Sequence, residues 1–169
     1  MHIILNDKEK DILELLQENP GLGIKEMGKS LGVSTVTVRS LLNGLSEKGY
    51  VLRTWGGAFP TFHPTMLEQI RNRVEEKNRI AKAAASLIQD GDTVMIEAGS
   101  TTALIARHLL GKRDITIVTN NTLILPYARA NPAIRLTLVG GEFRPQTESL
   151  VGPIALAELE RFHVKRAFV

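Results

Sequence analysis

The stretch from Thr35 to Asn43 combines hydroxyl, amide and guanidinium side chains at helical spacing. Such groups donate to phosphates and base edges of DNA, and an exposed valine can contact a thymine methyl group. The inward positions recur at i, i+4 and i+7 and are Val38, Leu42 and Leu45. The outward positions are Thr35, Val36, Thr37, Arg39, Ser40 and Asn43. The pattern predicts a helix that lies in the major groove of DNA.

Three later loops offer a second chemistry, because each follows a predicted strand with hydroxyl, amide or backbone N–H groups. They are Gly99-Ser100-Thr101-Thr102, Thr119-Asn120-Asn121 and Gly140-Gly141-Glu142. Free N–H groups at helix starts favour anions such as phosphate, while amides and a carboxylate suit sugar hydroxyls. Each loop alone also fits ordinary helix capping, but three at one sheet edge favour a ligand site. The ligand expected is a phosphorylated sugar or polyol.

The elements that must position the first face are short helices and a hairpin. The predicted elements are helices over 7–18, 24–31 and 34–48 and a strand over 50–54. Ser34 is suited to cap the third helix, and Gly56-Gly57 is a turn that returns the chain. These elements predict a helix-turn-helix followed by a two-stranded wing, which we assign to residues 1–58. The stretch 58–65, with Pro60 and Pro64, is expected to be a linker.

The remaining chain alternates strands with helices. We expect a linker and the start of a helix over 59–74 and an α/β domain over 75–169. The predicted helix over 66–89 places Ile80, Ala84, Leu87 and Ile88 on one face. The predicted strands are 93–98, 115–118, 135–139 and the beginning of another at 165–169. This alternation predicts an α/β fold with a parallel, open sheet.

The composition excludes several classes of protein. The chain has 169 residues, 43% apolar and 23% charged, as in globular proteins with a core. It has no cysteine, and its histidines, at positions 2, 63, 108 and 163, form no i, i+4 pair, so we expect no metal site. We find no signal peptide and no apolar run near the ~20 residues of a membrane helix. We therefore expect a cytoplasmic protein that does not bind membranes.

The net charge of +3 does not reside in the predicted DNA-binding domain. Residues 1–60 contain seven Lys/Arg and seven Asp/Glu, and the acids crowd the first helix. Phosphate neutralisation by a single copy should therefore be modest. We expect a homodimer or a higher homo-oligomer on DNA.

Six motifs in order resemble the DeoR family of bacterial transcription repressors. They are VSTVTVR (33–39), LSEKGYVLRTWGGA (45–58), EEKNRIAKAAASLIQDGDTVMIEAGSTT (75–102), TIVTNN (116–121), LVGGEF (138–143) and LVGP (150–153). The resemblance implies a winged helix-turn-helix and an effector domain related to sugar-phosphate isomerases. It implies that Ser34–Asn43 is the recognition helix and that Arg53 and Trp55-Gly56-Gly57 lie near the DNA backbone. It also implies that the three polar loops line an effector pocket and that sugar phosphate alters operator affinity.

The sequence departs from the family pattern in three places. Ser40-Leu41 stands where the family usually has a second base and an acid, so the resemblance does not establish operator preference or strength for this chain. Lys165 or Arg166 occupies the place of an acid before the late strand. The chain stops at Val169, whereas family members continue, so we expect an incomplete effector domain.

Alternative interpretations remain open at this point. Arg39 could contact DNA or be a solvated helix arginine, and Trp55 could enter a groove or pack on the wing's own domain. The second domain could only dimerise without sensing a ligand. An isomerase-like enzyme would need a positioned acid and base, and Glu97 and Glu142 show no matched spacing. We therefore expect a repressor without catalytic residues and without a cofactor.

Overall fold

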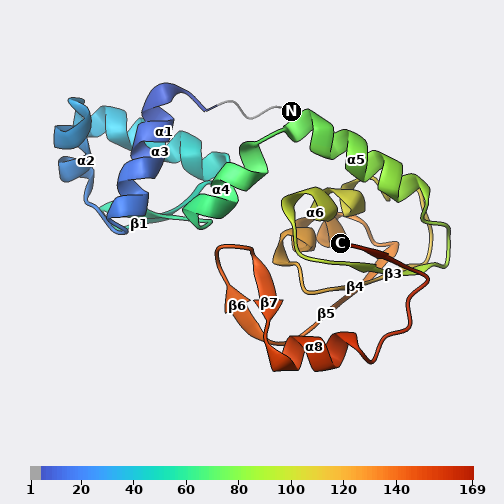
Figure 1. Ribbon diagram of the computed structural model, residues 1–169. Helices are drawn as coiled ribbons and strands as arrows, with labels where there is room; N and C mark the ends of the chain where they lie inside the picture. Colours follow the sequence, from blue (N-terminus) through green and yellow to red (C-terminus); the bar gives the residue numbers. More distant parts are fainter. Residues whose placement is uncertain (1–4) are drawn as a thin grey trace. The chain divides into compact units, whose positions relative to one another are not determined.

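The computed structural model describes residues 5–169, and the chain divides into two compact units, Met1–Pro64 and Thr65–Val169 (Figure 1). The boundary between the units falls within the stretch 59–74, which the sequence pattern predicts to be a linker and the start of a helix. Among the described residues, no helix is long and apolar enough to cross a membrane.

The first unit is a helix-turn-helix followed by a two-stranded wing, as predicted. Its elements are α1 (Asp7–Glu18), α2 (Ile24–Leu31), α3 (Thr35–Glu47), β1 (Val51–Thr54) and β2 (Gly57–Pro60). Val38, Leu42 and Leu45 of α3 are fully buried in one apolar cluster with residues of α1, α2 and both strands. The periodicity of α3 therefore identified the inward face correctly.

The wing extends into the predicted linker. β1 and β2 pair antiparallel, with Arg53 opposite Ala58 and Thr54 opposite Gly57. Ala58 is buried in the core of the unit. The linker prediction is therefore wrong for Ala58–Pro60, because its prolines indicated a break whereas Pro60 ends an outer strand.

The buried carboxylate of Glu9 connects the start of α1 with the end of α3. Glu9 is 4% exposed and forms a capping box with Asn6, in which each side chain accepts from the other's backbone N–H at 2.9 Å. The ammonium of Lys48, at the end of α3, lies 2.7 Å from Glu9 Oε1. This pair holds the start of α1 against the end of the third helix.

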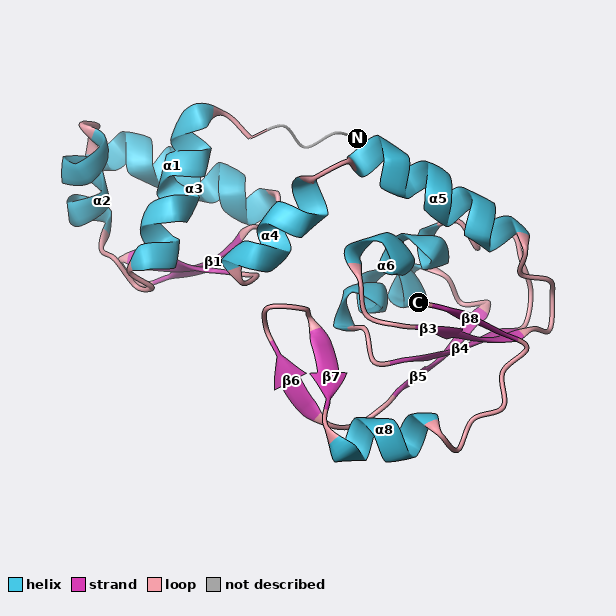
Figure 2. Cartoon of the chain, in the orientation of Figure 1, coloured by secondary structure: helices cyan, strands magenta, loops and turns pink. Residues whose placement is uncertain are grey.

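The single helix predicted over 66–89 is interrupted. It forms α4 (Pro64–Arg71) and α5 (Val74–Ser86), and Arg73 between them has a φ of 50°. This left-handed conformation cannot continue an α-helix. The break gives α4 and α5 separate directions (Figure 2).

The predicted buried face of α5 is only partly correct. Ile88, just beyond the helix, is buried, whereas Ile80 and Leu87 are 58% and 55% exposed. Ala81 and Ala85 face the core instead, because their small side chains let the helix lie close to its neighbours.

The second unit contains a four-stranded parallel sheet of order β5-β4-β3-β8. The strands are β3 (Thr93–Ile96), β4 (Ile115–Thr119), β5 (Ile134–Leu138) and β8 (Arg166–Phe168). The helical elements are α6 (Ser100–Arg107), η1 (Thr122–Ile124), α7 (Leu125–Ala130) and α8 (Pro153–Leu159). The predicted parallel α/β arrangement is confirmed.

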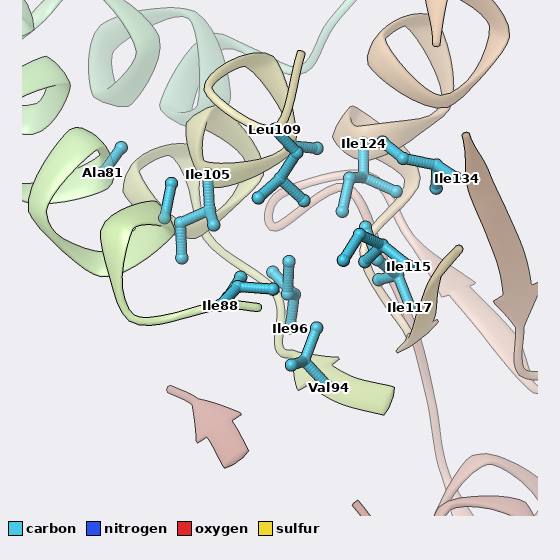
Figure 3. Close-up of a cluster of buried hydrophobic side chains, with 12 residues drawn as sticks. Ala81, Ile88, Val94, Ile96, Ile105, Leu109, Ile115, Ile117, Ile124 and Ile134 are labelled. Carbon is cyan, nitrogen blue, oxygen red and sulfur yellow. The ribbon is translucent and has the colours of Figure 1, made fainter. Parts of the chain in front are cut away.

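Two apolar clusters cover the two faces of this sheet. The larger lies between the sheet and the helices α5 and α6 and includes Val94, Ile96 and Ile117 (Figure 3). The smaller joins Val118 and Val139 to Ala155 of α8. The alternation of Ile117 and Val118 between the clusters follows the period of two in a strand.

A hairpin that the sequence pattern did not indicate follows β5. Its strands are β6 (Glu142–Arg144) and β7 (Ser149–Val151), and Glu142, predicted in a loop, is the first residue of β6. Three-residue strands with exposed side chains carry no clear alternation, which explains why the hairpin was missed.

Strand β8 is fixed at its start by a buried carboxylate. Asp92 is 5% exposed, and its oxygens lie 2.6 Å from Lys165 Nζ and 3.1 Å from Arg166 Nη1. The hydrogen bond from Lys165, with further contributions from the Gln89 backbone and Arg166, holds the pKa of Asp92 below its usual value. Lys165 and Arg166 therefore have a structural role.

Candidate functional site

The outer face of α3 is smaller than the sequence pattern suggests. Val36 is 70% exposed, and Arg39, Ser40 and Asn43 are exposed as predicted. Thr35 and Thr37 are only half-exposed. The four exposed side chains therefore form the accessible part of this face.

Ser34 is occupied by its role as a helix cap. Its hydroxyl accepts from Thr37 N–H at 3.1 Å and lies 2.9 Å from Thr37 Oγ1. This bond satisfies one of the free N–H groups at the start of α3. Ser34 and Thr37 therefore fix the start of α3.

A groove of about 580 Å³ opens beside the start of α3. Basic side chains line it from two helices: Lys25 and Lys29 of α2 and Arg39 of α3. Gly56 of the wing also lines it, and Gly56 O accepts from Ile24 N–H at 3.0 Å. Three cations and one carboxylate, that of Glu26, therefore line this groove, in a unit whose total charge is near zero.

Lys25 and Lys29 are missing from the predicted site, although their spacing contained a usable signal. They lie at i and i+4 on α2, away from the buried residues Ile24 and Met27. The sum of charges over the domain obscured this local cluster.

The tip of the wing presents a fully exposed Trp55, beside exposed Arg53 and Leu52. The alternative in which Trp55 packs on its own unit is therefore wrong. A large aromatic side chain in water at a hairpin tip is unusual for a merely structural residue.

In the second unit, the loop after β3 opens α6. The N–H groups of its first turn precede the first helical hydrogen bond, from Ala103 N–H to Gly99 O at 3.1 Å. Thr102 Oγ1 donates to Glu97 O at 2.7 Å and to Gly99 O at 3.0 Å, which fixes the loop. A side chain at Gly99 would approach Thr102 Oγ1 to 2.9 Å, so this compact turn requires glycine.

The loop after β4 is bonded directly to the loop after β3. Thr119 Oγ1 donates to Ile96 O. Asn121, which is fully buried, donates to Glu97 O at 3.2 Å and Gly99 O at 3.0 Å, and accepts from Leu123 N–H. These two side chains join the ends of β3 and β4, so their polar atoms are already used.

Asn120 differs from its two neighbours. It is 8% exposed, and its Nδ2 donates to Leu150 O of the hairpin at 3.3 Å. Its Oδ1 is buried and has no hydrogen-bond partner within residues 5–169. A buried acceptor without a partner is uncommon. The Oδ1 of Asn120 can therefore accept a hydrogen bond from a further donor.

In the third loop, Gly140 and Gly141 pack directly against α8 and the hairpin. Gly140 N–H donates to Glu158 Oε2 of α8 at 2.6 Å. A side chain at Gly141 would approach Val151 O to 2.6 Å. The two glycines thus allow the hairpin and α8 to pack closely, while Glu142 is exposed on β6.

A cation that the sequence pattern did not single out lies at the start of α6. Lys77 of α5 donates from Nζ to Ser100 Oγ at 2.9 Å and also to Gln69 O of α4. Burial lowers the pKa of Lys77. A sequence shows that Lys77 is on a helix but not which loop that helix will face.

Residues of α5, α6 and β8 line an apolar groove of about 490 Å³. It is lined by Thr101 and Thr102 of α6, by Ile80 and Ala84 of α5, and by Phe168 of β8. Among the described residues there is no group of three or more potential metal-ligating side chains.

Comparison with known proteins matches both units to models of one family. The DeoR-like helix-turn-helix domain matches residues 8–60, and the DeoR C terminal sensor domain matches residues 72–169. The chain belongs to the DeoR family. The relatives in this family are transcriptional regulators, as predicted, rather than enzymes.

Curated relatives in the DeoR family include three repressors with similar coverage. The Lactose phosphotransferase system repressor of Lactococcus lactis subsp. lactis is 34% identical over 94% of this chain and 65% of its own length. HTH-type transcriptional repressor CsqR of Escherichia coli is 34% identical, over 93% and 61%. GlcR of Bacillus subtilis is 32% identical, over 94% and 62%. The chain thus spans less than two thirds of the length of these relatives.

Proposed function

We propose that this chain carries the operator-binding and effector-sensing parts of a transcriptional repressor for a sugar-utilisation operon. The observation that carries the proposal is the presence, in one chain, of both DeoR-family domains. The name of one relative, the Lactose phosphotransferase system repressor, refers to a sugar system. Such a protein acts on chromosomal DNA in the bacterial cytoplasm.

For the DNA contact, we assign Val36, Arg39, Ser40 and Asn43 to the major groove. Lys25 and Lys29 neutralise phosphates beside the start of α3, because their groove also contains Arg39. Arg53, Trp55 and Gly56 of the wing contact the adjacent backbone or minor groove. The unit presents few cations in total, so binding by a homodimer to two half-sites supplies the remaining affinity.

For the effector, we assign the phosphate to the start of α6. The first-turn N–H groups and the ammonium of Lys77 supply donors and positive charge at one place. Ser100 and Thr101 are the hydroxyls nearest to these donors along the chain. Asn120, with its unused Oδ1, accepts from a sugar hydroxyl.

The remaining predicted loop residues have supporting roles in this proposal. They hold the ends of the strands together through the internal bonds described above. They are Gly99, Thr102, Thr119, Asn121, Gly140, Gly141 and Glu142.

A thermal-shift screen with a panel of sugar phosphates tests the sensing function. Each phosphorylated compound is compared with its unphosphorylated parent sugar at equal ionic strength. We expect at least one phosphate ester, and no parent sugar, to raise the unfolding temperature and to change affinity for operator DNA. DNA binding that responds to no ester would instead support a second domain that only dimerises.

A further inference from the structure

One side chain connects the proposed phosphate position with the helix at which the chain passes between its two units. The ammonium of Lys77 donates to Ser100 Oγ at the start of α6 and to Gln69 O in α4. Helix α4 begins at Pro64, the last residue of the first unit. Within the second unit, Lys77 is therefore shared between the loop that opens α6 and the helix α4.

The carbonyl group of Gln69, which accepts the hydrogen bond from Lys77, lies in the last turn of α4. Asn72 N–H donates to the carbonyl oxygen of Glu68 at 3.0 Å, and the next carbonyl group along the chain is that of Gln69. Carbonyl groups at a helix C-terminus lack intrahelical partners, and a cation there is favourable. Lys77 thus caps α4 from the first turns of α5.

The donor count of an ammonium group leaves room for a ligand. A lysine carries three N–H donors, and Lys77 uses two of them for Gln69 O and Ser100 Oγ. A phosphate at the start of α6 would accept a hydrogen bond from the third N–H group of Lys77. Burial disfavours the charged form of Lys77, so a bound anion would also stabilise its charge.

We infer that Lys77 couples effector occupancy to the end of α4, so that a bound phosphate fixes the helix leading from the DNA-binding unit. This inference rests on the proposed function, because it needs an anion at the start of α6. The coupling is reciprocal: a docked α4 holds the ammonium in place for the anion, and the anion holds the ammonium in place for α4. The α4 segment is the part of the sensing unit that directly continues the wing in sequence.

Amide hydrogen exchange over residues 64–73 measures this coupling in the full chain. Without ligand, Lys77→Gln should speed exchange at the end of α4 by about two- to five-fold, as expected from loss of a C-terminal cation. Lys82→Gln is the matched control, since it removes the same charge from an exposed position on α5. Equal exchange in both variants would overturn the capping role of Lys77.

Inorganic phosphate serves as the probe for the second half of the test, with chloride at equal ionic strength. Binding is followed by calorimetry, and Lys77→Gln should lower phosphate affinity by at least about ten-fold. At equal fractional occupancy, phosphate should slow α4 exchange in the wild type and in Lys82→Gln, which keeps the ammonium of Lys77. It should not slow exchange in Lys77→Gln.

The outcomes separate this inference from the proposed function. Phosphate binding that leaves α4 exchange unchanged in the wild type would overturn the coupling and leave the phosphate site intact. An equal response in Lys77→Gln and Lys82→Gln would do the same. Absence of phosphate binding to the wild type would overturn the proposed site and the coupling with it.

Discussion

Arg39 is the one residue of α3 that both lines the basic groove and lies on the exposed helix face. A guanidinium in this position can contact a guanine edge or a phosphate. A merely solvated arginine would contribute nothing to operator binding.

We expect Arg39→Ala to weaken operator binding by about 1–3 kcal/mol if Arg39 contacts a base. Lys8→Ala, which removes an exposed cation of α1, is the control and should change affinity little. Fluorescence anisotropy with operator and scrambled DNA at fixed salt measures both. A loss that is equal on the two DNAs would assign Arg39 to phosphate instead, and no loss would exclude it from the interface.

Asn120 and Asn121 are neighbours in sequence, but we assign Asn120 to ligand binding and Asn121 to support of the loops. Asn121 bonds two carbonyls of the β3 loop and one N–H of η1, whereas Asn120 makes one bond at 3.3 Å to the hairpin. Asn121→Ala should destabilise the protein by about 2–4 kcal/mol, because buried groups lose their partners. Asn120→Ala should cost only about 0.5–1.5 kcal/mol.

Chemical denaturation of both asparagine variants, followed by ligand titration, checks the assignment. Asn120→Ala should remain folded and lose affinity for the responding sugar phosphate more than for inorganic phosphate. Equal destabilisation by the two substitutions would contradict the distinction.

At the scale of elements, the start of α3 depends on the Ser34 cap. Ser34→Ala should cost about 0.5–2 kcal/mol of stability through loss of the bond to Thr37 N–H. Ser34→Asp keeps an acceptor at the cap and should restore stability, but its charge would repel DNA phosphates. Thermal unfolding and operator titration of both variants test this pair. Recovery of DNA binding by Ser34→Asp would be evidence against proximity of Ser34 to DNA.

The anchoring of β8 by Asp92 predicts a pH dependence. The pKa of Asp92 is lowered in the folded state, chiefly by the hydrogen bond from Lys165, so it is below the unfolded value of about 4. Its stabilising effect is therefore complete above that unfolded value and is lost as the pH falls through the folded pKa.

We expect Asp92→Asn to be less stable than the wild type at neutral pH and to lose less stability on acidification. Urea midpoints between about pH 7 and 3 measure the difference. Glu160→Gln, at an exposed carboxylate of the same unit, should follow the wild-type curve. Parallel curves for Asp92→Asn and the wild type would contradict an anchoring role.

At the scale of the whole molecule, each unit has its own apolar core. The cluster around Leu42 contains only residues of the first unit, and the cluster around Ile96 only residues of the second. Operator binding and effector binding should therefore be separable by core substitutions.

Leu42→Ala and Ile96→Ala should each destabilise their own unit by about 2–5 kcal/mol. We expect the first variant to lose operator binding while retaining stabilisation by sugar phosphate, and the second to show the reverse. Operator titration and thermal shift on both variants provide the measurement. Loss of both functions in either variant would show that the units fold as one.

The sequence by itself determined the parts of this protein that depend on local periodicity. The spacing of Val38, Leu42 and Leu45 predicted the buried face of α3, and the alternation of strands and helices predicted the parallel sheet. These patterns are readable because helix and strand periods relate residues only a few positions apart.

Only the tertiary structure decided which polar groups are available for binding. Thr119 and Asn121 were indistinguishable from Asn120 in the sequence, yet their hydrogen bonds are used between strand ends. The positions of Lys77 beside Ser100 and of Lys25 beside Arg39 were likewise not readable from spacing. Such contacts join residues far apart in the chain, so packing and strand register determine them rather than any local pattern.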